Sequence, residues 1–154
     1  MKLIVLYGTE SGNSELVAED LSEKLREDHD DVEIFDMQHF DPADLSAENF
    51  YFVICSTHGE GELPNSAVPF AEAFDELLPD LSGLRYAMFG LGDTYYTDTY
   101  SQGSEHIDRR FAAQGAERVG EYGRHDASGW DLASDVALEW LPGALEAAGL
   151  SVPA

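Results

Sequence analysis

Four short apolar runs separated by segments of helical periodicity constrain the fold of this chain more than any other feature. The runs are rich in β-branched and aromatic residues, as buried strands are, and they comprise residues 3–7, 32–35, 50–55 and 84–89. Residues 118–122 form a weaker fifth candidate. Because parallel neighbours require crossover connections, the alternation predicts a doubly wound α/β domain with a five-stranded sheet.

The segments between these runs predict four helices, each with one apolar face. Glycine at position 115 is expected to end the third helix, Pro142 is expected to kink or restart the fourth, and residues 36–48 show too weak a pattern for an assignment. The apolar positions that recur at helical spacing are Val17, Leu21 and Leu25; Phe70, Phe74, Leu77 and Leu78; Ile107 and Phe111; and Leu132, Val136, Trp140 and Leu145.

The charge balance excludes several classes of partner. Eight Lys and Arg residues stand against 31 Asp and Glu residues, which gives a net charge of −23 and repels nucleic acid and anionic membrane surfaces. No apolar run approaches the ~20 residues that span a bilayer. The apolar run at the first residues is too short for a signal peptide and has no small-residue cleavage site after it, so we expect none. The single cysteine, Cys55, excludes an internal disulfide. We therefore expect one domain over residues 1–154, monomeric and cytoplasmic, with no nucleic-acid or membrane partner.

The acidic residues are spread along the whole chain and not gathered in a tail. Their mutual repulsion is costly at ordinary ionic strength, but the Debye length falls to about 3 Å in molar salt, where neighbouring carboxylates largely stop interacting. The composition predicts a halophilic protein adapted to a salt-rich cytoplasm.

In a doubly wound sheet, ligands bind beyond the carboxyl ends of the strands. The first loop at that edge, residues 8–14, places three hydroxyls (Thr9, Ser11, Ser14) and the Asn13 amide at the start of a helix, with Gly12 allowing close approach. A helix N-terminus with such donors suits a phosphate. The loop lacks the Gly-Lys-Ser/Thr of an ATPase P-loop and the three glycines of a dinucleotide fold. A plain Ser/Thr-rich helix cap is the alternative.

The second and third loops each combine glycines with a ring side chain that can stack on a planar ligand, namely His58 and Tyr96. Each of these features is weak by itself, because a lone loop histidine is more often solvated and paired tyrosines are more often packing residues. Residues 56–67 and 90–103 are nevertheless expected to form the two walls of one site.

Taken together, the motifs Gly-Thr-Glu-Ser-Gly-Asn (8–13), Ser-Thr-His-Gly-Glu-Gly (56–61) and Phe-Gly-Leu-Gly-Asp-Thr-Tyr-Tyr (89–96) resemble the flavodoxin family. They resemble especially the FMN domains of diflavin reductases and their stand-alone relatives. The resemblance spans nearly the whole chain and implies a flavodoxin-like three-layer sandwich with sheet order 2-1-3-4-5. It also implies tightly but noncovalently bound FMN, and the chain length matches the short-chain form.

By position, the resemblance implies three sets of FMN-binding residues and one acidic neighbour. It implies neither a catalytic residue nor a metal ligand. Two departures from the family pattern are the histidine at position 58, where Tyr or Trp is usual, and residues 97–101, which lack the expected Phe and Asn. The implied phosphate ligands are Thr9, Glu10, Ser11, Gly12, Asn13 and Ser14; the inner face has Thr57, His58, Gly59 and Gly61; the outer face has Gly92, Asp93, Tyr95 and Tyr96; and Asp126 lies nearby.

The function implied is that of a one-electron carrier. A flavin or iron–sulfur reductase would be the donor and a redox enzyme the acceptor, and the acidic residues near the flavin would lower its potential. An FMN-dependent NAD(P)H:quinone reductase is the first alternative. A flavin-free signalling receiver domain is a remote one, because the chain lacks the acidic pair, the phosphoacceptor Asp and the Lys of that class at the matching strand ends.

Overall fold

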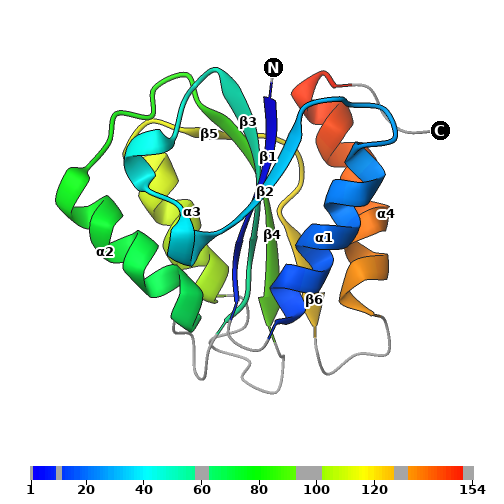
Figure 1. Ribbon diagram of the computed structural model, residues 1–154, viewed down its shortest axis with the longest axis horizontal. Coiled ribbons are helices and arrows are strands. Elements are labelled where there is room, and N and C mark those ends of the chain that lie inside the picture. The colour runs from blue at the N-terminus through cyan, green and yellow to red at the C-terminus, as the bar shows by residue number, and fades with distance from the viewer. Residues whose placement is uncertain (1, 10–11, 58–62, 93–101, 127–131, 151–154) are drawn as a thin grey trace.

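The computed structural model describes residues 2–9, 12–57, 63–92, 102–126 and 132–150. A parallel sheet forms its middle layer, and helices cover both faces (Figure 1). The strands are β1 (Lys2–Gly8), β2 (Val32–Asp36), β3 (Asn49–Cys55), β4 (Arg85–Gly92), β5 (Glu117–Arg118) and β6 (Gly123–Asp126). The α-helices are α1 (Asn13–Leu25), α2 (Val68–Leu77), α3 (Gln102–Ala113) and α4 (Ala133–Ala148).

The strand order is β2-β1-β3-β4-β5, and each pairing in the sheet is parallel, which confirms the predicted doubly wound fold. In register, Gly8 of β1 lies opposite Cys55 of β3, and Cys55 lies opposite Gly90 of β4. The carboxyl ends of these three central strands therefore lie at one edge of the sheet. The loops that follow them begin side by side.

The fifth position of the sheet differs from the expectation of one strand over residues 118–122. It holds two short strands, since β5 pairs with Arg85 and Tyr86 of β4, whereas β6 pairs with residues 89–92. Four residues, 119–122, stand opposite two residues of β4. Gly120 has a φ of 75° there, a backbone conformation that interrupts an extended strand.

Alternation along the strands divides the core into two layers. In β3, Phe50, Phe52 and Ile54 belong to the cluster under α1 and α4, whereas Tyr51 and Val53 belong to the cluster under α2 and α3. Figure 1 shows the same division, with α1 and α4 on one side of the sheet and α2 and α3 on the other. Both faces of the strand are buried, which explains why its sequence is continuously apolar.

The helices correspond to the predicted segments, with corrections at their ends. Leu77 and Leu78 are 49% and 59% exposed and do not continue the apolar face of α2, because the helix ends there and Leu78 has a φ of 47°. Leu132 is 70% exposed because it is the N-cap of α4 and not part of its buried face. Pro142 neither breaks nor restarts α4, which runs continuously and buries Leu141 and Leu145 on either side of the proline.

Residues 36–48, which the sequence left unassigned, contain two 3₁₀ turns, η1 (Met37–His39) and η2 (Pro42–Asp44). Asp36 and Asp41 precede the turns, and their carboxylates accept hydrogen bonds from the backbone N–H groups of Gln38 and Ala43, both at 2.9 Å. Across the part of the chain that the structure describes, no helix combines the length and apolar character needed to cross a membrane.

Candidate functional site

The loop after β1 is held in place by contacts with the segment before α2. The backbone N–H of Thr9 donates to the Ser66 hydroxyl at 2.7 Å, and the Ser66 N–H donates to the Thr9 carbonyl at 3.2 Å. A Cβ at Gly8 would lie 2.9 Å from the Ala67 methyl and 3.0 Å from the Met37 sulfur. Only glycine therefore fits at position 8, where the first strand passes into the loop.

The start of α1 presents polar groups toward the space that follows β1. Gly12 is the N-cap with a φ of 92°, and its N–H donates to the Thr9 hydroxyl at 2.8 Å. Ser14 is fully buried, and its hydroxyl has no hydrogen-bond partner among the described residues. A buried hydroxyl without a partner is costly, and at a helix N-terminus an anion can supply the missing acceptor. The Ser14 hydroxyl thus fits the phosphate of a bound FMN.

The loop after β3 is joined to the third helix. The Thr57 hydroxyl accepts a hydrogen bond from the backbone N–H of Gly103 at 3.0 Å, so a side chain 46 residues away caps the first turn of α3. The Ser56 N–H donates to the Gly8 carbonyl at 3.1 Å, which extends the pairing of β1 and β3 beyond the last strand residues. The second loop is therefore anchored to both the first loop and α3.

The loops after β4 and β6 begin beside each other, because Gly92 and Asp126 are register partners at the ends of these strands. The structure thus brings six predicted site positions to one edge of the sheet: Thr9, Gly12, Ser14, Thr57, Gly92 and Asp126. Asn13 is the first residue of α1. The remaining predicted residues lie outside the described part of the chain: Glu10, Ser11, His58, Gly59, Gly61, Asp93, Tyr95 and Tyr96.

Two residues that support this edge were missed by sequence reasoning, namely Ser66 and Gly103. Both act through contacts with residues 57 and 46 positions away in the chain. A serine inside a polar loop and a glycine before a helix carry no local signal of such contacts. Only the strand order, which brings the loops after β1 and β3 together, could have suggested them.

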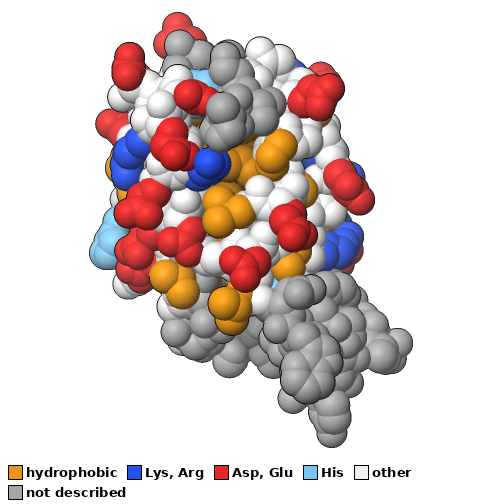
Figure 2. All heavy atoms as spheres, turned by 90° about the vertical axis from the view of Figure 1, so that its right-hand side faces the viewer, with side chains coloured by type: hydrophobic (Ala, Val, Ile, Leu, Met, Phe, Trp, Pro, Cys, Tyr) orange, Lys and Arg blue, Asp and Glu red, His pale blue; other side chains and the backbone are white. Residues whose placement is uncertain are grey.

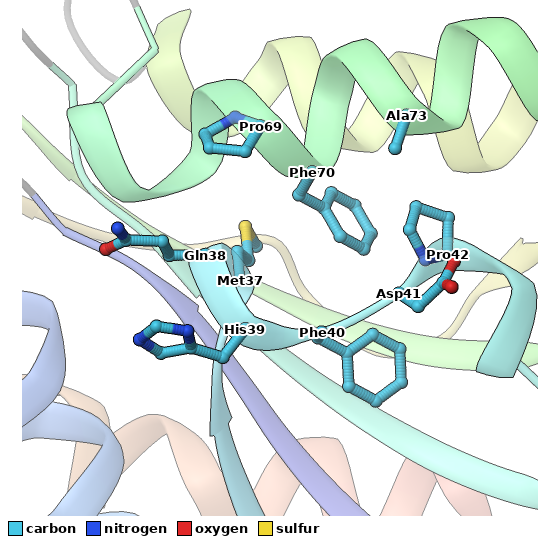
Figure 3. A pocket seen from close by; sticks show the side chains of 9 residues that line it. All are labelled: Met37, Gln38, His39, Phe40, Asp41, Pro42, Pro69, Phe70 and Ala73. Carbon is cyan, nitrogen blue, oxygen red and sulfur yellow. The ribbon is translucent and has the colours of Figure 1, made fainter.

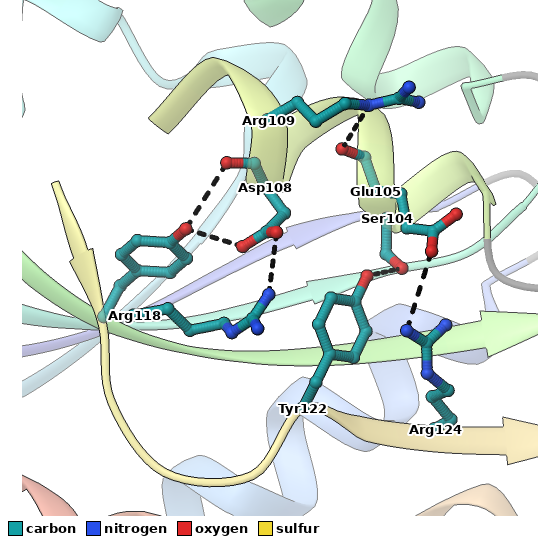
Figure 4. Close-up of polar contacts among 8 residues, drawn as sticks. Ser104, Glu105, Asp108, Arg109, Arg118, Tyr122 and Arg124 are labelled. Atoms are coloured by element: carbon teal, nitrogen blue, oxygen red, sulfur yellow. Dashed lines mark hydrogen bonds and ion pairs between the residues drawn. The ribbon is translucent and has the colours of Figure 1, made fainter. Parts of the chain in front are cut away.

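A polar cluster joins α3 to the split fifth strand (Figure 4). The Asp108 carboxylate accepts hydrogen bonds from the Tyr86 hydroxyl at 2.6 Å and from Arg118 at 2.8 Å. The guanidinium groups of Arg118 and Arg124 lie 4.9 and 4.1 Å from the centre of the Tyr122 ring. Burial raises the pKa values of Tyr86 and Tyr122, so both phenols stay protonated at neutral pH.

Two further contacts complete this cluster. The hydroxyl of Tyr122 hydrogen-bonds the fully buried Ser104 hydroxyl in the first turns of α3, and Arg124 forms an ion pair with Glu105 at 3.6 Å. The cluster therefore fixes the chain between β5 and β6 against the helix that follows the third loop. It is a support of the site edge and not part of the predicted FMN contacts.

A separate pocket of about 360 Å³ lies between the 3₁₀ turns and α2 (Figure 3). Its lining is mostly apolar at the base, where Met37 and Phe70 are buried, and polar at the rim. Among the predicted site residues that the structure describes, none lines this pocket. The lining residues are Met37, Gln38, His39, Phe40, Asp41, Pro42, Pro69, Phe70 and Ala73.

Electrostatics near the start of α1 are dominated by carboxylates. Burial raises the pKa of Tyr7 to about 12, and the nearby Asp36, Glu15 and Glu19 contribute in the same direction. The positive end of the α1 dipole and the backbone N–H groups are therefore the main features that favour an anion at this edge. A phosphate bound here would rely on neutral donors and the helix dipole.

Three features define a flavodoxin-like nucleotide-binding domain: the sheet order, the first loop that requires glycine at position 8, and a buried Ser14 hydroxyl that has no partner among the described residues. Comparison with known proteins agrees, since the flavodoxin family model matches residues 5–140. Protein MioC of Escherichia coli O157:H7 is 35% identical over 139 residues, which cover 90% of this chain and 92% of MioC. The chain therefore belongs to the flavodoxin family, whose cofactor is FMN.

Two other similarities are informative. The flavoprotein alpha-component of sulfite reductase from Thiocapsa roseopersicina is 36% identical over 120 residues, 77% of this chain but only 23% of that protein. The C101S mutant of flavodoxin from Pseudomonas aeruginosa superposes with a TM-score of 0.82 at 32% identity, covering 97% of this chain and 99% of that one. The same fold thus occurs both as a separate protein and as part of a larger reductase.

Proposed function

We propose that this protein is a one-electron carrier that receives electrons from a flavin or iron–sulfur reductase and passes them to a redox enzyme. The observation that carries the proposal is the buried Ser14 hydroxyl at the start of α1, which lacks an acceptor among the described residues and matches a cofactor phosphate. The similarity to MioC over nearly the full length of both chains supports a carrier that works as a separate protein.

Bound FMN would supply the one-electron chemistry, and the residues of this chain would bind and orient it. Ser14 would hold the phosphate with its hydroxyl at the start of α1, where Gly12 is the N-cap. Thr57 lies two residues after the end of β3 and Gly92 is the last residue of β4, so both would border the space that the ring would enter, and Gly103 fixes Thr57. The remaining family positions, including His58 and Tyr96, would contact the ring.

The charge distribution supports a carrier whose partners are basic. Each of the eight Lys and Arg side chains contacts an oxygen acceptor within the same chain. None of these side chains is therefore set aside for binding an anionic partner protein. The pairs are Lys2–Glu33, Lys24–Glu27, Arg26 with the Val32 carbonyl, Arg85 with the Ala148 carbonyl, Arg109 with the Glu105 carbonyl, Arg110–Asp75, Arg118–Asp108 and Arg124–Glu105.

The excess of carboxylates has two further consequences. It disfavours an additional negative charge on a reduced cofactor, which lowers the reduction potential and favours electron donation. The carboxylates also repel one another, and this repulsion is weaker in concentrated salt. We therefore propose that the protein works at high ionic strength, where screening lowers the cost of a net charge of −23.

The test is reconstitution followed by electron transfer. The apoprotein is titrated with FMN and with riboflavin, loaded with FMN, reduced anaerobically by light with EDTA as the electron donor, and mixed with ferric cytochrome c. Tight FMN binding and stoichiometric one-electron reduction of the haem are expected. Steady turnover of NADPH with a quinone, without any added reductase, would contradict the carrier proposal and indicate a quinone reductase.

A further inference from the structure

The pocket on the α2 side of the sheet points to a second ligand site. It has a volume of about 360 Å³ and lies between the two 3₁₀ turns and α2 (Figure 3). Pockets for small molecules are roughly 300–1,000 Å³, so this one has room for a compact organic ligand. The FMN-site residues that the structure describes do not line it, so such a ligand would bind apart from the cofactor.

The floor of the pocket is apolar and aromatic. Met37 and Phe70 are buried there, and the half-buried ring of Phe40 lies 6.4 Å from the ring of Phe70, centre to centre. Aromatic faces attract cations, and a thioether sulfur packs well against rings. The floor therefore suits a ligand with an aromatic or aliphatic body.

The walls of the pocket are fixed before any ligand binds. Pro42 lines it from η2 and Pro69 from α2, and proline has a restricted φ angle. Ala73 points from α2 toward Pro42 (Figure 3). The Asp41 carboxylate accepts the Ala43 N–H at 2.9 Å and so holds η2 in place. A preformed pocket loses little ordering free energy when it takes up a ligand.

The charges around the pocket favour a cation. Both lining elements belong to residues 27–84, a stretch that contains no Lys or Arg. Asp41 is at the rim, and a carboxylate that accepts one N–H can accept further donors. Among the described lining residues, only His39 can carry a positive charge, and its ring points away from Asp41 (Figure 3). On α3, which covers the same face of the sheet, the Arg110 guanidinium donates to both carboxylate oxygens of Asp75.

Carboxylates alone do not mark a binding site in this chain. Figure 2, which faces α1 and α4 on the other side of the sheet, shows acidic side chains spread over that surface as well. The α2 side differs because a carboxylate stands at the rim of a preformed aromatic pocket. This combination is specific to an amphiphilic cation, since the apolar floor and the charged rim each bind one part of it.

We propose that this pocket binds a small organic cation of the arylalkylammonium type. The apolar body would rest on Met37, Phe40 and Phe70, and the ammonium group would donate to the Asp41 carboxylate in a charge-assisted hydrogen bond. The proposal does not depend on the carrier function, because it involves none of the predicted FMN contacts.

The experiment titrates the FMN-saturated protein with phenethylammonium and follows backbone amide shifts by NMR in about 0.1 M KCl, where the Debye length is about 10 Å. Phenethyl alcohol and hydrocinnamate are the neutral and anionic analogues, and a Lys-Phe-Lys tripeptide tests for a peptide ligand. Met37 is left unchanged, because its sulfur lies 3.0 Å from the position of a Cβ at Gly8 in the first loop.

Two pairs of variants make the test specific. Asp41→Asn removes the rim charge but keeps the oxygen that accepts the Ala43 N–H, and Asp44→Asn removes a charge from the same 3₁₀ turn outside the pocket lining. Ala73→Trp fills the pocket from the exposed side of α2, and Ala112→Trp places the same ring on an exposed position of α3. A melt of each variant checks folding, and the Asp41 and Asp44 pair decides the matter if Ala73→Trp does not fold.

We expect saturable shifts at residues 37–41 and 70–73, with the alcohol about fivefold weaker and hydrocinnamate weaker still. Asp41→Asn should weaken phenethylammonium about fivefold and Asp44→Asn less than about twofold, while Ala73→Trp abolishes binding and Ala112→Trp preserves it. The proposal is overturned if no saturable shifts appear at these residues up to about 10 mM, or if the alcohol binds as tightly as the cation. Equal losses in Asp41→Asn and Asp44→Asn overturn it in favour of attraction to the net charge. A tripeptide that binds more than about tenfold tighter overturns it in favour of a peptide ligand.

Discussion

Replacing Ser14 by alanine should separate the stability of the apoprotein from its affinity for FMN. The Ser14 side chain is fully buried, and its hydroxyl has no partner among the described residues. Burying a hydroxyl without a hydrogen bond costs about 1–3 kcal/mol. The Ser14→Ala apoprotein should therefore melt at the same temperature as wild type or higher, whereas most buried polar substitutions destabilise.

FMN binding should change in the opposite direction. A hydrogen bond from the Ser14 hydroxyl to a phosphate is charge-assisted and contributes about 1.5–3 kcal/mol. Its loss corresponds to a weakening of FMN binding by one to two decades, at about 1.4 kcal/mol per decade. Riboflavin lacks the phosphate, so its dissociation constant should stay within about twofold of wild type.

Ser22 provides a control on the same helix. Like Ser14, Ser22 is buried on α1, with 1% of its surface exposed. Unlike Ser14, its hydroxyl has a partner, because it donates to the Ala18 carbonyl at 2.8 Å. Ser22→Ala should leave the ratio of FMN to riboflavin affinity unchanged. The measurements are fluorescence titrations with both flavins and thermal melts of each apoprotein. An equal loss of affinity for FMN and riboflavin in Ser14→Ala would refute the assignment of this hydroxyl to the phosphate.

Three further outcomes are expected. The wild-type melting temperature should be markedly lower in dilute buffer than in molar KCl, because salt screens the net charge of −23, and a melt independent of KCl would contradict adaptation to salt. Gly123→Ala should lower the free energy of unfolding by more than about 3 kcal/mol, because the added Cβ would overlap the rings of Phe89 and Trp140. Gly143→Ala has open space around the added Cβ and should raise the free energy of unfolding by up to about 1 kcal/mol. Denaturant titrations measure both changes. The pKa of Tyr7 is raised to about 12 in the folded chain. The protonated phenol therefore contributes its full stabilisation below pH ~10, and this contribution is lost as the pH rises toward 12. Tyr7→Phe should flatten the dependence of the unfolding free energy on pH in this range, measured by unfolding at fixed KCl.

Most of the fold could be predicted from the sequence, because buried parallel strands appear in it as short continuous apolar runs. The run at residues 50–55 is apolar on both faces of the sheet, and β3 matches it to within one residue. Helix ends were less predictable, since exposure of Leu77 and Leu132 depends on where the chain turns and not on spacing. The break in the fifth position of the sheet was missed because residues 118–122 predict one weak strand, whereas Gly120 turns the chain there.

The candidate site was predictable where motifs follow strands and unpredictable where remote residues support them. The positions of Thr9, Gly12 and Ser14 follow from a strand, a glycine and a helix start that are contiguous in the chain. Ser66 has no such signal, because its two hydrogen bonds to Thr9 form only when β1 and β3 are neighbours. The ring-facing role of His58 remains a prediction from family resemblance, because the residue lies outside the described part of the chain.

The split fifth position of the sheet bears on how molecules of this protein avoid one another. A long, unbroken edge strand offers a row of free backbone groups on which a second copy can add a strand. In dilute buffer, the shared negative charge keeps copies apart, but molar salt removes that protection. The interruption at residues 119–122 leaves two residues of β5 and four of β6 in extended pairing along this edge, within the described part of the chain. Backbone shape thus limits edge-to-edge association under the conditions in which charge no longer does.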